Sequence, residues 1–96
     1  MTPAFEHLRQ MNFRPHALTP ETLVGRLAGG VEVKAVMHPL HGVALLGYYV
    51  GPRSAVEFEE RIPGDASLSE VTQAIVRIYE QIGASDPQWK ALHMRE

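Results

Sequence analysis

The 96-residue chain contains no cysteine. It can therefore form neither a disulfide framework nor a metal site built on thiolates. Small secreted domains usually carry such cross-links, so their absence favours a cytoplasmic protein. Long apolar runs are also missing. The longest strongly apolar stretch, Gly42 to Gly51, has about half the length that a membrane-spanning helix needs. The chain also starts without a basic segment followed by an apolar run, so we expect no signal peptide and no membrane association.

The chain also has little excess charge of either sign, since its formal net charge at pH 7 is only -2. This balance gives no general attraction to nucleic acid or to anionic lipid. The apolar share of 45% is typical of a globular domain and argues against a disordered tail. A chain of this length is enough for one domain.

Two Thr-Pro pairs predict helix starts, because threonine caps a helix and proline suits its first position. The first pair, Thr2-Pro3, predicts a short N-terminal helix with Phe5 and Leu8 on one face. The second pair predicts a helix from Pro20 to Ala28, which Gly29-Gly30 would end.

The strongest local signal is the capping box Ser67-Leu68-Ser69-Glu70, in which the first and last side chains satisfy free backbone N–H groups. Apolar residues then recur at helical spacing, which predicts a helix from Leu68 to Ile82 with Gly83 as its stop. Asp86-Pro87 begins a last short segment that carries Trp89.

Three segments between these helices are predicted to form strands. Val31–Met37 alternates apolar and polar residues, and Val43–Val50 is rich in Val, Leu and Tyr. The third strand runs from Ala55 to Ile62. The connections at 38–42 and 51–54 contain proline and glycine, which favour turns.

These elements predict an α+β fold: a three-stranded antiparallel meander with two helices on one face, giving an α-β-β-β-α core with short N- and C-terminal helices added. We expect a single domain over residues 1–96. Within it, residues 1–17 form the N-terminal helix and connection, 18–83 the core, and 84–96 a short C-terminal helix or tail.

The middle strand is apolar on both faces, whereas a sheet with one wet face normally alternates. One face carries Val43, Leu45 and Tyr49, and the other carries Ala44, Leu46, Tyr48 and Val50. The long helix covers only one face. The terminal segments, through Phe5 and Leu8 or through Trp89 and Leu92, could cover the second. That face could instead be an interface with another protein or a second copy, or one side of a ligand pocket.

Candidate catalytic residues are few. His38 and His41 lie three apart in a turn and would suit zinc if further ligands arrived from elsewhere. Glu57, Glu59 and Glu60 could act as acid and base, although charged residues on an outer strand usually protect its edge. Neither a serine nucleophile elbow nor a glycine-rich phosphate loop occurs. The sequence therefore favours a protein that is not an enzyme, and we expect no cofactor.

The predicted order of helix, three strands and helix over Pro20 to Gly83 resembles that of double-stranded RNA-binding domains, in element order and length alone. Those domains grip phosphate with a basic cluster at the start of the final helix. Here the stretch from Glu57 to Glu70 is acidic, and the basic residues are scattered along the sequence.

The sequence thus favours a small interaction or regulatory domain that self-associates through an apolar sheet face. The predicted contact residues are Ala44, Leu46, Tyr48, Val50 and Trp89. The alternatives are a nucleic-acid-binding module and a metal-dependent enzyme that uses His38 and His41.

Overall fold

The computed structural model describes residues 3–19, 21–38, 42–50 and 55–93. They form one antiparallel sheet of five strands with three α-helices, which confirms the α+β class. The strands follow one another in the order β1-β2-β3-β4-β5, so each pairs with its neighbour in sequence. Their bounds are Arg14–Pro15 (β1), Thr22–Arg26 (β2), Val31–His38 (β3), Gly42–Val50 (β4) and Ala55–Ile62 (β5). The α-helices are Pro3–Gln10 (α1), Leu68–Ser85 (α2) and Pro87–His93 (α3), and a single 3-10 turn, Ala28–Gly30 (η1), joins β2 to β3.

The predicted three-strand count is wrong because the segment predicted as the helix Pro20–Ala28 contains strand β2. Leu23 and Leu27 suggested a helical stripe, but Leu23 and Gly25 alternate inward as strand residues. Gly25 lies directly beneath the ring of Phe13, where an added Cβ would come within 2.6 Å of Cδ1. Such close packing of a ring on bare backbone suits a strand. The α-β-β-β-α order predicted for 18–83 is therefore wrong at its first helix.

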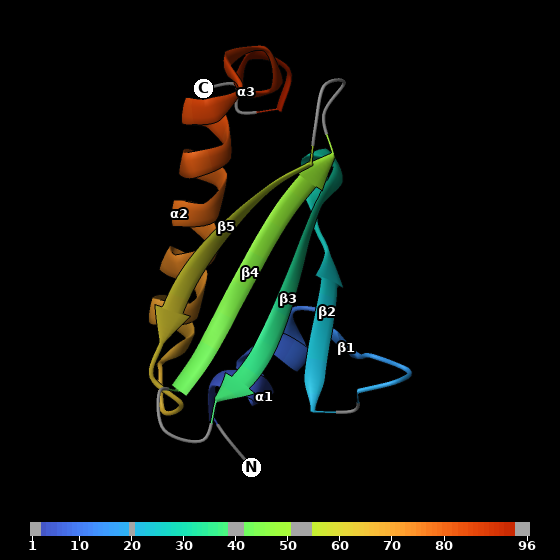
Figure 1. The fold of residues 1–96 in the computed structure, drawn as a ribbon. Coiled ribbons are helices and arrows are strands. Elements are labelled where there is room, and N and C mark those ends of the chain that lie inside the picture. Colours follow the sequence, from blue (N-terminus) through green and yellow to red (C-terminus); the bar gives the residue numbers. More distant parts are fainter. Residues whose placement is uncertain (1–2, 20, 39–41, 51–54, 94–96) are drawn as a thin grey trace.

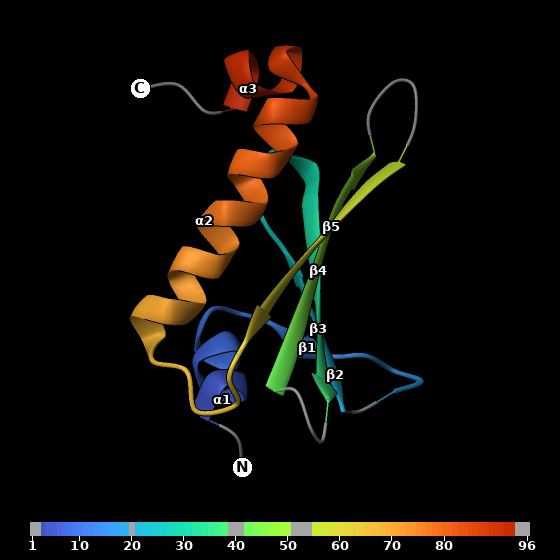
Figure 2. The ribbon, with the colours of Figure 1, turned by 60° about the vertical axis from the view of Figure 1, so that its left-hand side comes forward.

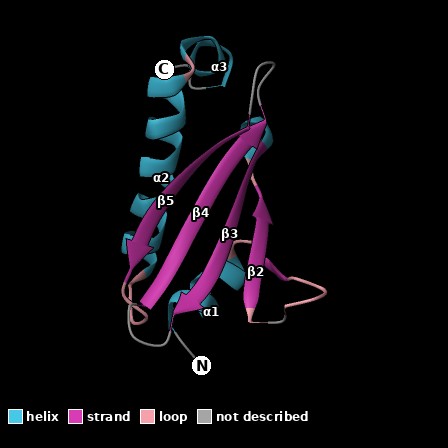
Figure 3. Cartoon of the chain, viewed as in Figure 1, coloured by secondary structure: helices cyan, strands magenta, loops and turns pink. Residues whose placement is uncertain are grey.

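All three helices lie on one side of the sheet (Figures 1 and 2). Helix α2 crosses β4 and β5, and α1 fills the end of the same layer beside β2. The backbone N–H of Ala4 donates to the carbonyl of Gly64 at 3.1 Å, which fixes α1 to the connection between β5 and α2. Figure 3 shows the same two-layer arrangement of helices behind strands.

The core fills the space between these two layers. It draws on the inward residues of β2 to β5, on one stripe of α2 and on the apolar residues of α1. Its largest fully buried side chains are Leu8, Phe13, Leu23, Leu45, Ile78 and Ile82. Burial of such side chains contributes about 1.5–3 kcal/mol each to the stability of the fold.

Helix α2 begins at the predicted capping box. The hydroxyl of Ser67 accepts from the backbone N–H of Glu70 at 3.2 Å, and the Glu70 carboxylate accepts from the backbone N–H of Ser67 at 3.1 Å. The predicted stop at Gly83 is wrong, because Gly83 is helical and buried. The helix ends at Asp86 instead, where Pro87 disfavours a helical conformation in the residue before it.

Among the described residues, no helix is both long and apolar enough to cross a membrane.

Candidate interaction surface

The sheet has a second face that no helix covers in the described part of the chain (Figure 2). We call it the open face. Because antiparallel partners point to the same side, the strand registers define its members. Its described side chains are Arg14, Thr22, Val24, Arg26, Glu32, Lys34, Val36, His38, Ala44, Leu46, Tyr48, Glu57, Glu59 and Arg61.

The middle of the open face is apolar. Leu46 on β4 lies beside Lys34 on β3 and Glu59 on β5, and Ala44 lies beside Val36. These apolar side chains are half-buried, because longer neighbours on both sides partly shield them. The predicted cover by terminal segments is not what the structure shows. Phe5 and Leu8 are buried on the helix side instead.

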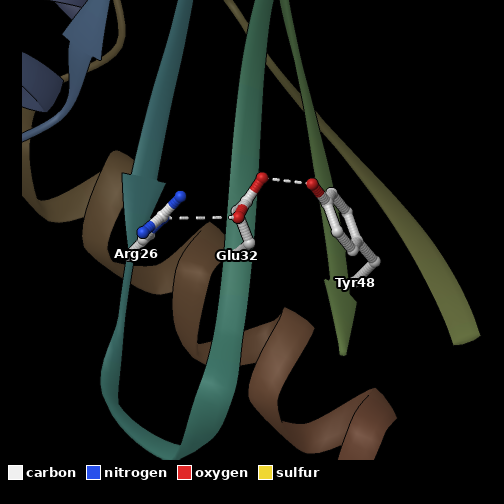
Figure 4. Close-up of polar contacts among 3 residues, drawn as sticks. All are labelled: Arg26, Glu32 and Tyr48. Carbon is white, nitrogen blue, oxygen red and sulfur yellow. Dashed lines mark hydrogen bonds and ion pairs between the residues drawn. The ribbon is translucent and has the colours of Figure 1, made fainter. Parts of the chain in front are cut away.

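A polar row crosses the open face at one end of the apolar middle (Figure 4). The hydroxyl of Tyr48 donates to the carboxylate of Glu32, and Nε of Arg26 lies 3.7 Å from the other oxygen of that carboxylate. The pKa of Tyr48 is raised above its ordinary value of 10.0, chiefly by the hydrogen bond to Glu32 and to a smaller extent by partial burial. The side chain of Arg26 is 89% exposed, so its guanidinium keeps most of its hydrogen-bonding capacity for other groups.

Charge on the open face is divided across the strands. The β1–β3 side carries Arg14, Arg26 and Lys34 against Glu32 alone, which gives three positive charges and one negative charge. The β5 side carries Glu57 and Glu59 against Arg61, which lies 3.3 Å from Glu59. That side is therefore net negative, and the face has one basic and one acidic half.

The basic half contains a hollow of about 560 Å³ that is open to solvent. Val24 lies between Arg14 and Lys34 in the sheet register, and all three line the hollow. Arg26, Glu32, Tyr48 and His16 also line it, so its charged wall consists of three cations and one carboxylate, and that carboxylate is already bound to Tyr48 and Arg26. Neither Arg14 nor Lys34 forms an ion pair within the described ranges, so both cations are available to an incoming anion.

The structure brings together three of the five predicted contact residues: Ala44, Leu46 and Tyr48 share the open face. Val50 ends β4, and its side chain falls outside the described part of the structure. Trp89 lies on the other side of the sheet and is only 3% exposed, so it does not belong to this surface.

Trp89 has a structural role instead. Its indole N–H donates to the carbonyl of Gly29 at 2.9 Å, and its ring stacks on Tyr79 with centroids 5.8 Å apart. The ring of Tyr49 lies 5.7 Å away, and its hydroxyl donates to Asp86. These contacts fasten α3 and the end of α2 over the turn between β2 and β3.

Of the two predicted metal ligands, the structure describes one. His38 is the last residue of β3, and His41 lies outside the described residues. Within the described ranges, no group of three or more His, Asp or Glu side chains is arranged to hold a metal ion. Of the three glutamates of β5, Glu60 faces the helix side, where it pairs with Arg77 of α2. Glu57 and Glu59 share the open face.

Sequence reasoning missed the basic half of the open face. Arg14, Arg26 and Lys34 are far apart in the chain and meet only because β1, β2 and β3 are paired. One signal was available. Thr22, Val24 and Arg26 alternate with inward residues, and the glycine pair that follows suits a hairpin turn as well as a helix stop.

Comparison with known proteins gave no match, either to a family model, to a curated protein sequence or to a solved structure.

Proposed function

We propose that this protein is a small interaction domain that self-associates by packing the open face of one copy against the open face of a second. The observation that carries the proposal is the combination on one uncovered face of an apolar middle with two halves of opposite charge. An uncovered apolar centre rimmed by polar residues is typical of interaction sites. The absence of cysteine supports a cytoplasmic setting for this assembly.

A second copy is the occupant that the charges favour. A surface that carries both a basic and an acidic half is complementary to itself, since rotation of a copy by a half-turn can bring opposite charges together. A purely acidic partner would meet Glu57 and Glu59, and a purely basic one would meet Arg14, Arg26 and Lys34. The open face therefore suits its own copy better than a partner of one charge.

The size of the open face sets the expected affinity. Five strands at a spacing of about 4.8 Å, and the eight residues of β3 at about 3.3 Å each, give a projected area on the order of 500 Å² per copy. Two copies would bury about 1,000 Å² in total, which is near the lower limit of specific interfaces. We therefore expect a dimer with a dissociation constant in the micromolar range.

Nucleic acid is the competing occupant, because the basic half and Tyr48 could contact phosphate and a base. The two acidic residues of β5 lie on the same face and would repel a backbone that crosses it. The charge division thus favours a protein partner over RNA or DNA.

Sedimentation velocity from low micromolar to near-millimolar protein tests the proposal. We expect wild type to shift from monomer to dimer, and Leu46→Glu to remain monomeric because it places a charge in the apolar middle of the interface. Val76→Glu is the matched control. Val76 is an exposed apolar residue of α2, on the helix side, so its substitution leaves the dimer intact.

Circular dichroism establishes that each variant is folded. If Leu46→Glu does not fold, Ala44→Glu replaces it, because Ala44 lies on the same face with a smaller side chain. A wild type that stays monomeric at the highest concentration would overturn the proposal. Retention of labelled RNA or DNA by that monomer at low salt would assign the open face to nucleic acid instead.

A further inference from the structure

We infer the arrangement of the dimer: its two-fold axis runs along the strands, between β3 and β4, and seats Glu59 of each copy in the basic hollow of the other. This inference rests on the proposed self-association and specifies which residues meet. It follows from the registers of the five strands and from the positions of the charges within them.

The polar row provides the first argument. Read from β2 to β5, it consists of Arg26, Glu32, Tyr48 and Glu57. Reversal of this order sets Arg26 against Glu57 at both ends and Glu32 against Tyr48 in the middle. The row is therefore complementary to its own reverse. A half-turn about an axis between β3 and β4, parallel to the strands, produces this reversal and keeps the two sheets aligned as in sandwich packing.

The adjacent row supports the same axis. It consists of Arg14, Val24, Lys34, Leu46 and Glu59. The half-turn that joins Arg26 to Glu57 brings Glu59 over Val24, the residue between Arg14 and Lys34. This is the hollow of about 560 Å³, which has room for a carboxylate with two available cations beside it.

The other simple two-fold axis, across the strands, fails on charge. It keeps each strand over its own copy, so the basic half would cover the basic half and the acidic half the acidic half, and an axis through the row of Lys34 would set Glu59 against Glu59. Like charges that meet in an interface repel each other and weaken association, which disfavours that arrangement. The charge division thus selects the axis along the strands.

Charge reversal in a pair of residues tests the arrangement. At low salt, Arg26→Glu and Glu57→Arg should each raise the dissociation constant about tenfold or more, because the two-fold axis repeats every altered contact. The double variant restores opposite charges at both contacts, and we expect its dissociation constant to return to within about threefold of wild type. Glu80→Arg makes the same charge change on α2, away from the open face, and should leave the constant unchanged.

The inference and the proposed function fail in different ways. A dimer that Leu46→Glu dissociates, but in which the double variant stays as weak as the single ones, keeps the open face as the interface and overturns this axis. A wild type without a dimer overturns both. Lys34→Glu provides an independent check on the hollow: the arrangement requires weaker association, with rescue by Glu59→Lys, and unchanged association would contradict it.

Discussion

Gly47 allows helix α2 to lie close against the middle of the sheet. It faces inward from β4, between two residues of the open face, and the buried side chain of Ile78 lies over it. A Cβ at this position would approach Cγ2 of Ile78 to under 3.0 Å and Cδ1 to 3.2 Å. Carbon atoms pack at about 3.5–4.0 Å, so Gly47→Ala forces α2 away from the sheet or Ile78 out of its rotamer.

The size of the effect follows from two opposing terms. Overpacking of a well-filled core costs about 1–3 kcal/mol. Replacement of glycine by alanine in a strand returns about 0.5–1 kcal/mol, because the unfolded chain has less freedom to lose. We therefore expect Gly47→Ala to lower the free energy of unfolding by about 1.5 kcal/mol, which corresponds to a fall in Tm of roughly 6–12 °C in a domain of this size.

Urea unfolding followed by circular dichroism measures this change, and a double-mutant cycle isolates its cause. In an Ile78→Ala background the space above Gly47 is empty, so the same Gly47→Ala substitution should cost nothing or stabilise the protein. An equal loss in both backgrounds would refute the steric reasoning. Dimer formation, as proposed, should survive in the folded variant, since Gly47 faces away from the open face.

Two further predictions concern the cap of α2 and the tyrosines. Ser67→Ala removes the side chain that accepts from the backbone of Glu70, and should cost about 1 kcal/mol in urea unfolding, whereas Ser69→Ala, in the same first turn, should change stability by less than about 0.5 kcal/mol. The pKa values of Tyr48 and Tyr49 are raised above 10.0 by their hydrogen bonds to Glu32 and Asp86, and that of Tyr79 by burial. Unfolded tyrosines ionise near pH 10 and folded ones at higher pH, so this contribution to stability is complete below about pH 10 and is lost as the pH rises further. Ultraviolet absorbance follows the ionisation of the tyrosines as the pH rises. A titration midpoint of the folded protein no higher than that of the urea-unfolded chain would contradict this prediction.

Local signals in the sequence predicted the elements that depend on local interactions. The capping box specifies the start of α2, because each of its hydrogen bonds joins residues three apart. Strand β3 was identified from its alternation, β4 from its content of Val, Leu and Tyr, and the turns on either side of β4 from proline and glycine. The two faces predicted for β4 agree with the observed registers.

Tertiary contacts explain the elements that were predicted wrongly from the sequence. The start signal before β2 and the spacing of its leucines favour a helix, but Phe13 packs on Gly25 and β3 supplies the strand's hydrogen bonds. Likewise Gly83, a common helix stop, is buried inside α2, which continues to Ser85 with Asp86 as its C-cap. Such contacts override propensities that amount to about 1 kcal/mol per residue.

The apolar residues of the open face could be predicted from the sequence, but its division of charge could not. The apolar residues of β4 stood out because they break the alternation expected of a half-covered sheet, and they led to this face. Its charges did not stand out, because a pattern of opposite halves exists only once five strands are placed in register. Trp89 was assigned to the same surface on hydrophobicity alone, and its hydrogen bond to Gly29 shows why a buried indole belongs elsewhere.

The strand order has a consequence for how the chain folds. Every strand pairs with its sequence neighbour, so the sheet can grow one hairpin at a time and each step closes only a short loop. The inner face nevertheless stays bare until α2, which follows the last strand, packs on it. We therefore expect a transition state in which the hairpins of β3, β4 and β5 are formed and α2 is docking, with the contact between Ala4 and Gly64 made last.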